Sequence, residues 1–366
     1  VAVALNGSNR VMTSPDGITW TARAAAAVSN WFYVTYGNGL FVAVANSGTT
    51  LVMTSPDGIT WTPRTVAEAN QWQSVTYGNG LFVAVAVTGT NRVMTSPDGI
   101  TWTARAATGV TTRWNSVTYG NGLFVAVGTP NSPSTTRVMT SLDGINWTAR
   151  TEVGALGWAC VTYGNGLFVA VGIGDPNRVM TSPDGITWTA RTAAEPNSWI
   201  EVTYGNGLFV AVAFDGTNRV MTSPDGITWT ARAAAAANSW VGVTFGNNSF
   251  VAVGANSVMT STIHEINLQG GSPLTSIPDG DNAPTAAKGT DFGNVNVGSN
   301  EVKTFTIQNT GGVPLNISSI SSSNGLYVVS GLTLPTTITA GGSATFTVTF
   351  SPTTTGAQNA TITVNN

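Results

Sequence analysis

The sequence of 366 residues has little of what many catalytic and metal sites use, with one cysteine, Cys160, and one histidine, His264. A single cysteine excludes an intramolecular disulfide framework. His264 follows the last repeat and has no second histidine as a partner, which argues against a Ser–His–Asp triad and against a histidine-based metal site. We therefore expect no catalytic residue, no cofactor and no metal.

Charge is also scarce, because only 8% of the residues are charged and the net charge is −3. This balance provides no basic face for nucleic acid, which we do not expect as a partner. The chain contains no run of 18 apolar residues, so the sequence predicts no membrane-spanning segment.

What the chain does contain is a repeat of seven residues, Ser-Pro-Asp-Gly-Ile-Thr-Trp, whose fourth copy reads Ser-Leu-Asp-Gly-Ile-Asn-Trp. The copies begin at Ser14, Ser55, Ser96, Ser141, Ser182 and Ser223, at intervals of 41, 41, 45, 41 and 41 residues. A fixed period near forty indicates an array of one supersecondary unit, since a single copy cannot bury its own apolar face.

Each repeat holds four short runs rich in Val, Thr, Phe, Tyr and Trp, which favour strands. Asn-Gly and Pro-Asp-Gly between the runs are tight-turn signals. Four antiparallel strands per unit of this length predict an all-β fold, a β-propeller of four-stranded blades. Val-Met-Thr-Ser of the third strand occurs seven times and Val-Thr-Tyr/Phe-Gly of the first strand six times. Seven blades, the first without its inner strand and the last with residues 263–268 as its fourth, are the simplest count; six are the alternative.

The seven-residue repeat resembles the Asp-box of bacterial-neuraminidase-type repeats, Ser-x-Asp-x-Gly-x-Thr-Trp, although it is one residue shorter between Asp and Gly. In that family the box forms the hairpin between the third and fourth strands of a blade and serves the fold. The resemblance implies a structural role for Asp16, Asp57, Asp98, Asp143, Asp184 and Asp225. Sialidase activity is not implied, because the motif supplies neither the arginine cluster nor the tyrosine nucleophile.

Composition changes after residue 268, where Gly, Pro, Asp and Ser become frequent. The sequence predicts a propeller over residues 1–268, a linker over 269–287 and an Ig-like β-sandwich over 288–366. Strict alternation in segments such as Phe346–Phe350 supports the sandwich. Asp291–Val295, Asn309–Gly311, Ala340–Ser343 and Phe350–Pro352 resemble the choice-of-anchor D family of Hydin-type modules, which implies a secreted or surface bacterial protein.

Variation between the repeats collects on one face of the predicted disc. The turns between strands one and two and between strands three and four are nearly constant, and we call their side the turn face. The other connections differ in sequence and lie on the opposite side, the loop face. The candidate ligand-binding residues there are Phe32, Tyr33, Gln73, Arg113, Asn115, Asp175, Glu195, Glu201 and Asp215. Loops also drift without function, so a face without a ligand is the alternative.

Three functions fit these features. The first is a non-catalytic, extracellular or bacterial cell-surface protein of structural or adhesive function, which binds protein partners or its own subunits. The second is a multivalent carbohydrate-binding propeller, in which near-identical blades give several weak sites. The third, with less support, is a glycoside hydrolase that uses two acids of the loop face. We also expect the strands missing from both ends to come from outside the printed chain, either from further sequence or from a neighbouring subunit.

Overall fold

The computed structural model describes residues 1–109, 111–131, 135–151, 153, 157–174, 177–247, 249–262, 266–278, 280–310 and 314–366. The chain divides into two compact units, one of Val1–Gly246 with Phe250–Thr260 and one of Ser261–Asn366 with Asn247–Ser249. The described residues form strands and turns without an α-helix. They contain no helix that is long and apolar enough to cross a membrane.

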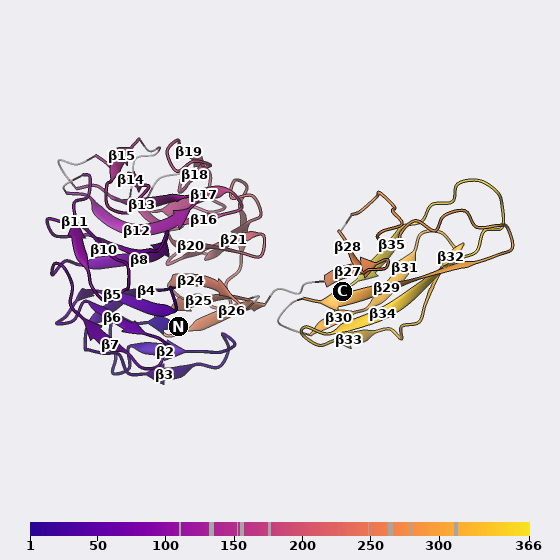
Figure 1. The fold of residues 1–366 in the computed structure, drawn as a ribbon, viewed down its shortest axis with the longest axis horizontal. Coiled ribbons are helices and arrows are strands. Elements are labelled where there is room, and N and C mark those ends of the chain that lie inside the picture. Colours follow the sequence, from indigo (N-terminus) through magenta and orange to yellow (C-terminus); the bar gives the residue numbers. More distant parts are fainter. Residues whose placement is uncertain are drawn as a thin grey trace. The chain divides into compact units, whose positions relative to one another are not determined.

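The first unit contains seven antiparallel sheets that follow one another along the chain, here called blades 1 to 7 (Figure 1). Blade 1 has three described strands, β1 (Ala2–Val3), β2 (Val11–Thr13) and β3 (Thr21–Arg23). Blade 2 has β4 (Asn30–Gly37), β5 (Leu40–Ser47), β6 (Val52–Ser55) and β7 (Thr62–Arg64). Blade 3 has β8 (Trp72–Gly78), β9 (Leu81–Ala86), β10 (Val93–Ser96) and β11 (Thr103–Arg105).

Blades 4 to 6 repeat this order, and blade 7 has three described strands. Blade 4 has β12 (Arg113–Gly120), β13 (Leu123–Thr129), β14 (Val138–Ser141) and β15 (Thr148–Arg150). Blade 5 has β16 (Trp158–Gly164), β17 (Leu167–Gly172), β18 (Val179–Ser182) and β19 (Thr189–Arg191). Blade 6 has β20 (Trp199–Gly205), β21 (Leu208–Ala213), β22 (Val220–Ser223) and β23 (Thr230–Arg232), and blade 7 has β24 (Trp240–Gly246), β25 (Ser249–Gly254) and β26 (Val258–Thr262).

The core lies between the blades because both faces of each sheet are covered. In β5 the run Val42–Ala43–Val44 is fully buried, as a strand packed on both faces requires. In blades 2 to 6 the first-to-second strand turn has Asn and Gly at positive φ, as at Asn38 (49°) and Gly39 (74°). Two positive φ values give the tight turn whose twist matches the strands it joins.

The first strand of each blade from 2 to 7 faces the middle of the ring, and a glycine spaces these inner strands. The aromatic ring of Tyr119 in β12 lies over Gly78 in β8, so a Cβ at Gly78 would lie 2.1 Å from a ring carbon. The same contact joins every consecutive pair of inner strands from β4 to β24, and the glycines are Gly37, Gly78, Gly120, Gly164 and Gly205. Gly246 of β24 has nothing within 4 Å of the Cβ position.

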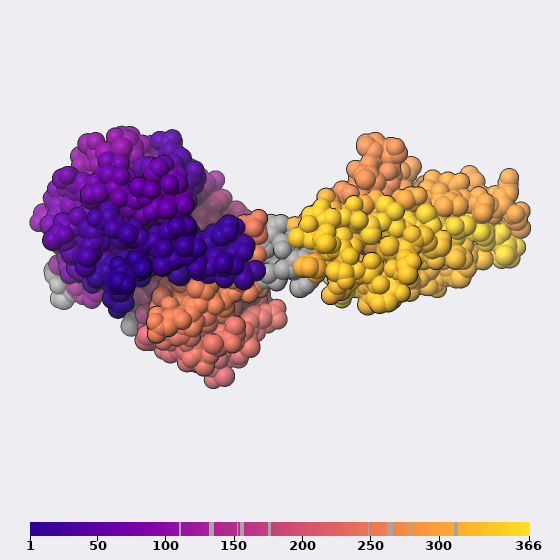
Figure 2. Space-filling model, turned by 90° about the horizontal axis from the view of Figure 1, so that it is seen from below, coloured from indigo at the N-terminus to yellow at the C-terminus, as the bar shows by residue number. Residues whose placement is uncertain are grey.

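Blade 7 lies beside blade 1, so the ring is closed. The hydroxyl of Thr260 in β26 donates a hydrogen bond to the carbonyl oxygen of Gly17 at 2.9 Å. Figure 2 shows the N-terminal residues, in indigo, against the salmon surface of the later blades. Blades 1 and 7 form separate sheets. This agrees with seven blades rather than with six blades closed by a mixed sheet.

The prediction that residues 263–268 form the fourth strand of blade 7 is wrong. Residues 263–265, His264 among them, lie outside the described residues, and β27 (Ile266–Gly270) belongs to the second unit. It pairs with β29 (Glu301–Asn309) from Ile266↔Asn309 to Gly270↔Phe305, and β28 (Thr275–Ile277) pairs with it on the other side. The boundary therefore differs from residue 268, and part of the expected linker 269–287 is a strand, because β29 offers a long edge that β27 covers.

The second unit is the predicted β-sandwich. Its larger sheet has the order β28-β27-β29-β34-β32, with β34 at Ser343–Phe350 and β32 at Tyr327–Ser330. Two further pairs are β30 (Leu315–Ile317) with β33 (Thr336–Ile338) and β31 (Ser319–Ser322) with β35 (Ile362–Asn365). The alternation of β34 buries Phe346, Val348 and Phe350 on one face.

Candidate functional site

Two acids predicted on the loop face are held by hydrogen bonds of their own loops. Asp215 accepts hydrogen bonds from the N–H and the hydroxyl of Ser198 at 2.6 and 2.7 Å. Glu195 accepts one from the N–H of Asn218 at 3.2 Å and another from its side-chain amide. These bonds join the loop before β20 to the loop between β21 and β22, so both carboxylates order loops. Asp175, a further candidate, lies outside the described residues.

Each inner strand from β4 to β20 bulges one residue after its tryptophan. The pairing of β8 with β9 passes from Trp72↔Ala86 to Ser74↔Val85, which leaves Gln73 without a partner in the ladder. The register shifts at the same place in β4, β12, β16 and β20. The bulge turns three candidate residues, Phe32, Gln73 and Asn115, away from the ladder.

The bulged residues differ in what they offer a ligand. Phe32 is 42% exposed. The Asn115 amide donates to the carbonyl oxygen of Trp158 at 2.8 Å and to the hydroxyl of Thr129 at 3.1 Å, which ties blade 4 to blade 5. Arg113 begins β12 and is exposed. These residues are spread over blades 2 to 4.

The structure brings two candidates, Tyr33 and Glu201, together with Cys160 at the middle of the ring. The Tyr33 hydroxyl of β4 donates to Glu201 Oε1 of β20 at 3.2 Å, although 168 residues separate them. Cys160 Sγ of β16 donates to the same oxygen at 3.3 Å. Since β4 and β20 belong to blades 2 and 6, this axial cluster of Tyr33, Cys160 and Glu201 joins blades that are not sequence neighbours (Figure 1).

Burial changes the acid–base properties of the axial cluster. It raises the pKa of the Glu201 carboxyl to about 7, against the smaller opposing effect of its hydrogen bonds from Cys160 and Tyr33. Burial and the nearby Glu201 charge raise the pKa of the Cys160 thiol well above its ordinary value. The pKa of Tyr33 is also raised well above its ordinary value, chiefly by the charge of Glu201. Glu201 therefore exchanges its proton near neutral pH, and the thiol stays protonated there.

The sequence carries a signal for this cluster in the equivalence of positions between blades. Counted from each inner-strand tryptophan, the second residue occupies the same position in every blade, and these residues are Tyr33, Ser74, Ser116, Cys160, Glu201 and Gly242. Ser74 and Ser116 at this position accept hydrogen bonds from the N–H groups of Val117 and Val161 in the following blade, both at 3.2 Å. Blade equivalence therefore predicts that Glu201 faces the axis.

The repeated tryptophans at the start of the inner strands are core residues. All six are at most 3% exposed, and they are Trp31, Trp72, Trp114, Trp158, Trp199 and Trp240. Four indole N–H groups donate to the carbonyl oxygen four residues earlier, as Trp72 does to Glu68 at 3.3 Å. Tryptophans this deeply buried cannot stack on a sugar without rearrangement of the blade.

The turn-face aspartates are engaged inside their own turns. Asp57 Oδ1 accepts hydrogen bonds from the N–H groups of Ile59 and Thr60, both at 2.8 Å, and from the Ser55 hydroxyl at 2.9 Å. The same three bonds recur in all six copies, and the other carboxylates are those of Asp16, Asp98, Asp143, Asp184 and Asp225. This geometry is that of a turn-forming aspartate.

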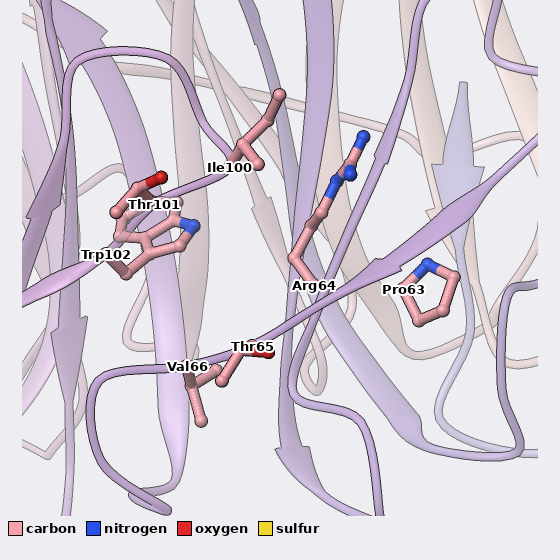
Figure 3. A pocket seen from close by; sticks show the side chains of 7 residues that line it. All are labelled: Pro63, Arg64, Thr65, Val66, Ile100, Thr101 and Trp102. Atoms are coloured by element: carbon pink, nitrogen blue, oxygen red, sulfur yellow. The ribbon is translucent and has the colours of Figure 1, made fainter.

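A pocket on the outer rim was absent from the predicted site. It lies between the last strand of blade 2 and the third-to-fourth strand turn of blade 3, with a volume of about 380 Å³. Figure 3 shows Arg64 and Trp102 on two sides of it, with Ile100 near the end of the arginine. The signal in the sequence was Thr-Ala/Pro-Arg after each box, which repeats in every copy.

In the part of the chain that the structure describes, no group of three or more His, Cys, Asp or Glu side chains is arranged to hold a metal ion. The available groups are thus the axial cluster, the loop-face side chains and the rim pocket.

Comparison with known proteins supports both units. Residues 286–366 match the family model described as HYDIN/CFA65/VesB-like, Ig-like domain. That match identifies an Ig-like domain in the second unit. A search of curated proteins gave no match.

Several solved structures resemble the chain at low identity. A catalytically inactive virginiamycin B lyase from Staphylococcus aureus with quinupristin is 12% identical, over 63% of this chain and 80% of that one, with a TM-score of 0.56. YCF48 bound to D1 peptide is 14% identical, over 70% and 86%, with a TM-score of 0.53. The computationally designed Ika8 protein is 13% identical, over 70% and 85%, with a TM-score of 0.50. These likenesses show the fold alone, which is propeller-like.

Proposed function

We propose that the protein is a non-catalytic structural or adhesive protein of the cell exterior, in which the propeller is a rigid interaction disc and the Ig-like domain a spacer or assembly module. A propeller joined to an Ig-like domain supports a role in protein interaction or structure. The observation that carries the proposal is the structural role of the six repeated turn-face aspartates. All six of them are hydrogen-bonded within their own turns, so the repeated chemistry builds the disc.

The loop face, where the blades differ in sequence, remains available to bind partners. Phe32 is 42% exposed and Phe214 49% exposed there. Among the similar structures, one is a complex of YCF48 with a peptide, and a peptide or protein partner on this face is the corresponding expectation here. The partners in this proposal are other proteins or further copies of the chain.

Surface labelling of intact producing cells tests the location and the role together. Antibodies raised against residues 1–260 should bind intact cells, and brief external trypsin treatment should remove that signal. Electron microscopy of the released material should show the protein within a larger assembly. Labelling that requires cell lysis, with a known cytoplasmic protein as the control, would contradict the proposal.

Carbohydrate binding is the second candidate, favoured by the rim pocket. An arginine, two threonines and a tryptophan edge line this pocket, and its parts repeat around the disc. Glycoside hydrolysis is the third. It needs two carboxyl groups across a sugar, and Glu201, with its raised pKa of about 7, is a candidate acid whose environment suits proton donation. Loss of any measured glycosidase activity in Glu201→Gln would support it.

A further inference from the structure

Six arginines recur at one position, the end of the fourth strand in blades 1 to 6. Each Nε donates to the hydroxyl of a threonine on the adjacent third strand at 2.8–3.1 Å, as Arg64 does to Thr54. The residues are Arg23, Arg64, Arg105, Arg150, Arg191 and Arg232. Among the described residues, the salt bridges involve Lys288 and Lys303, and none of these six guanidinium groups has a carboxylate partner. Half of the twelve arginines of the ring thus present Nη groups at its rim that have no partner among the described residues.

The pocket in Figure 3 shows what surrounds such a guanidinium. Arg64 shares it with Thr65 of its own blade and with Ile100, Thr101 and Trp102 of the next blade. Trp102 is 8% exposed and Ile100 is 43% exposed, so an aliphatic side chain and an indole edge face the same space as the cation. Hydroxyl groups, an aromatic edge and a guanidinium are the groups that bind an acidic sugar.

The arginine and the facing Ile–Thr/Asn–Trp segment recur at five junctions between consecutive blades, whereas the residue equivalent to Thr65 is Ala24 or Ala106 at two of them. Five of the six arginines face an Ile–Thr/Asn–Trp segment of the next blade, and they are Arg23, Arg64, Arg105, Arg150 and Arg191. The segments begin at Ile59, Ile100, Ile145, Ile186 and Ile227. The five isoleucines are 38–45% exposed, so this apolar side chain is similarly placed at each junction. At the ends of the array the set is incomplete. Ile18, whose preceding blade has no described fourth strand, is 67% exposed, and Arg232, followed by blade 7, is exposed where the other five arginines are half-buried.

We propose that these five rim sites bind an acidic polysaccharide, with one sugar carboxylate at each guanidinium. This rests on carbohydrate binding, the second candidate function given above, and names the class of carbohydrate. Charge complementarity requires an anionic ligand, because each guanidinium still has unpaired N–H donors in a fork that matches a carboxylate. Repetition favours a polymer with a repeating unit, because one such chain can occupy several equal sites and gain avidity.

Binding of the full chain to immobilised polygalacturonate, with neutral dextran as the reference, tests the proposal. We expect binding to polygalacturonate that weakens with added salt, and none to dextran. Replacement of all five complete-site arginines by glutamine should weaken binding by about tenfold or more, whereas Arg64→Gln alone should change it by less than about threefold, since four sites remain. Lysine at the five positions keeps the charge but removes the fork, and should restore only part of the affinity.

The chain supplies a matched control in Arg232→Gln, which removes the same charge and the same threonine contact from the incomplete site. It should leave binding unchanged. Equal melting temperatures of the variants show that folding is not the cause. The proposal is overturned if the fivefold variant binds as well as the parent, if Arg232→Gln weakens binding as much as Arg64→Gln, or if polyglutamate competes as well as the polysaccharide. Any of these results leaves the surface-labelling test of the proposed function unaffected, so the two failures are distinguishable.

Discussion

Asp57 illustrates how one carboxylate organises a turn. Its Oδ1 accepts three hydrogen bonds, from two N–H groups and a hydroxyl. Asp57→Ala should lower the melting temperature, because the N–H groups of Ile59 and Thr60 lose their acceptor. Asp57→Asn keeps an oxygen in place and should lower it less. Any loss of partner binding in these variants should be explained by their lower melting temperature. Loss of binding at an unchanged melting temperature would show that Asp57 contacts a ligand.

Trp61 of the same turn stabilises the ring by filling space in the core. It is 8% exposed, and its indole N–H donates to the carbonyl oxygen of Gly58 at 3.0 Å. Trp61→Ala should cost about 3–5 kcal/mol of unfolding free energy, because a cavity opens between blades 1 and 2. Chemical denaturation measures this cost, with Trp20→Ala as the control. Trp20, in the equivalent turn of blade 1, is half-buried, so its replacement should cost less, and equal costs would contradict the packing argument.

Glu201 predicts a pH dependence of stability. Burial raises its pKa from 4.5 to about 7, so the folded state favours the protonated carboxyl. Its contribution is complete below about pH 4.5 and is lost as the pH rises through 7, a change of at most about 3 kcal/mol. The turn aspartates have lowered pKa values, because backbone N–H groups stabilise their carboxylates. Their contribution to stability is therefore lost only as the pH falls below about 4. The two effects therefore occupy separate pH ranges.

Denaturation between pH 4.5 and 8 measures this effect. Glu201→Gln should remove most of the decrease, since glutamine does not ionise. Tyr33→Phe should move the midpoint of the decrease to higher pH, because the Tyr33 hydroxyl stabilises the charged form of Glu201. An unchanged profile in Glu201→Gln would show that another group titrates.

At the scale of the element, the inner strand is defined by the contact of an aromatic ring with a glycine. Gly78→Ala should destabilise the ring by about 1–3 kcal/mol, because the added Cβ would overlap the ring of Tyr119. Gly246 occupies the same position in β24 and has nothing within 4 Å of its Cβ position, so Gly246→Ala should be neutral or slightly stabilising. Equal denaturation midpoints for the two variants would contradict this account.

Strands and turns were predictable from the sequence because each blade repeats the same local signals. Asn38-Gly39 and Pro56-Asp57-Gly58 specify turns through backbone preference, which acts over four residues. The pairing partner of an edge strand was not predictable in this way. Residues 263–268 read as a continuation of blade 7, yet β27, which begins at Ile266, pairs with β29, more than thirty residues further along the chain. Local pattern does not determine which free edge a strand joins.

Whole-molecule contacts were the hardest to predict. Tyr33 and Glu201 were both candidates by their variability, but their hydrogen bond depends on the curvature of the ring, which no single repeat encodes. The rim pocket was missed for the same reason, because Arg64 and Trp102 come from different blades. The closed ring itself followed from the repeat number, since an array of this length has to cover its end blades.

The second unit supplies a prediction about where the Ig-like domain begins. The family model matches residues 286–366, whereas β27 pairs with five residues of β29 and lies before that range. Leu268 of β27 and Ile277 of β28 pack against the core of the unit. A fragment of residues 266–366 should therefore unfold cooperatively, and residues 286–366 should be less stable by about 2–4 kcal/mol, from the loss of two partly buried side chains and the strand pairing.

The shorter fragment should also associate, since removal of β27 leaves the edge of β29 unpaired. Denaturant unfolding gives the stability difference, and sedimentation gives the association state. Leu268→Asp in the longer fragment is the matched control: it keeps the backbone of β27 over the edge while removing the apolar contact. This variant should be destabilised yet remain monomeric. If residues 286–366 were as stable and as monomeric as residues 266–366, β27 would be dispensable and the domain would begin after it.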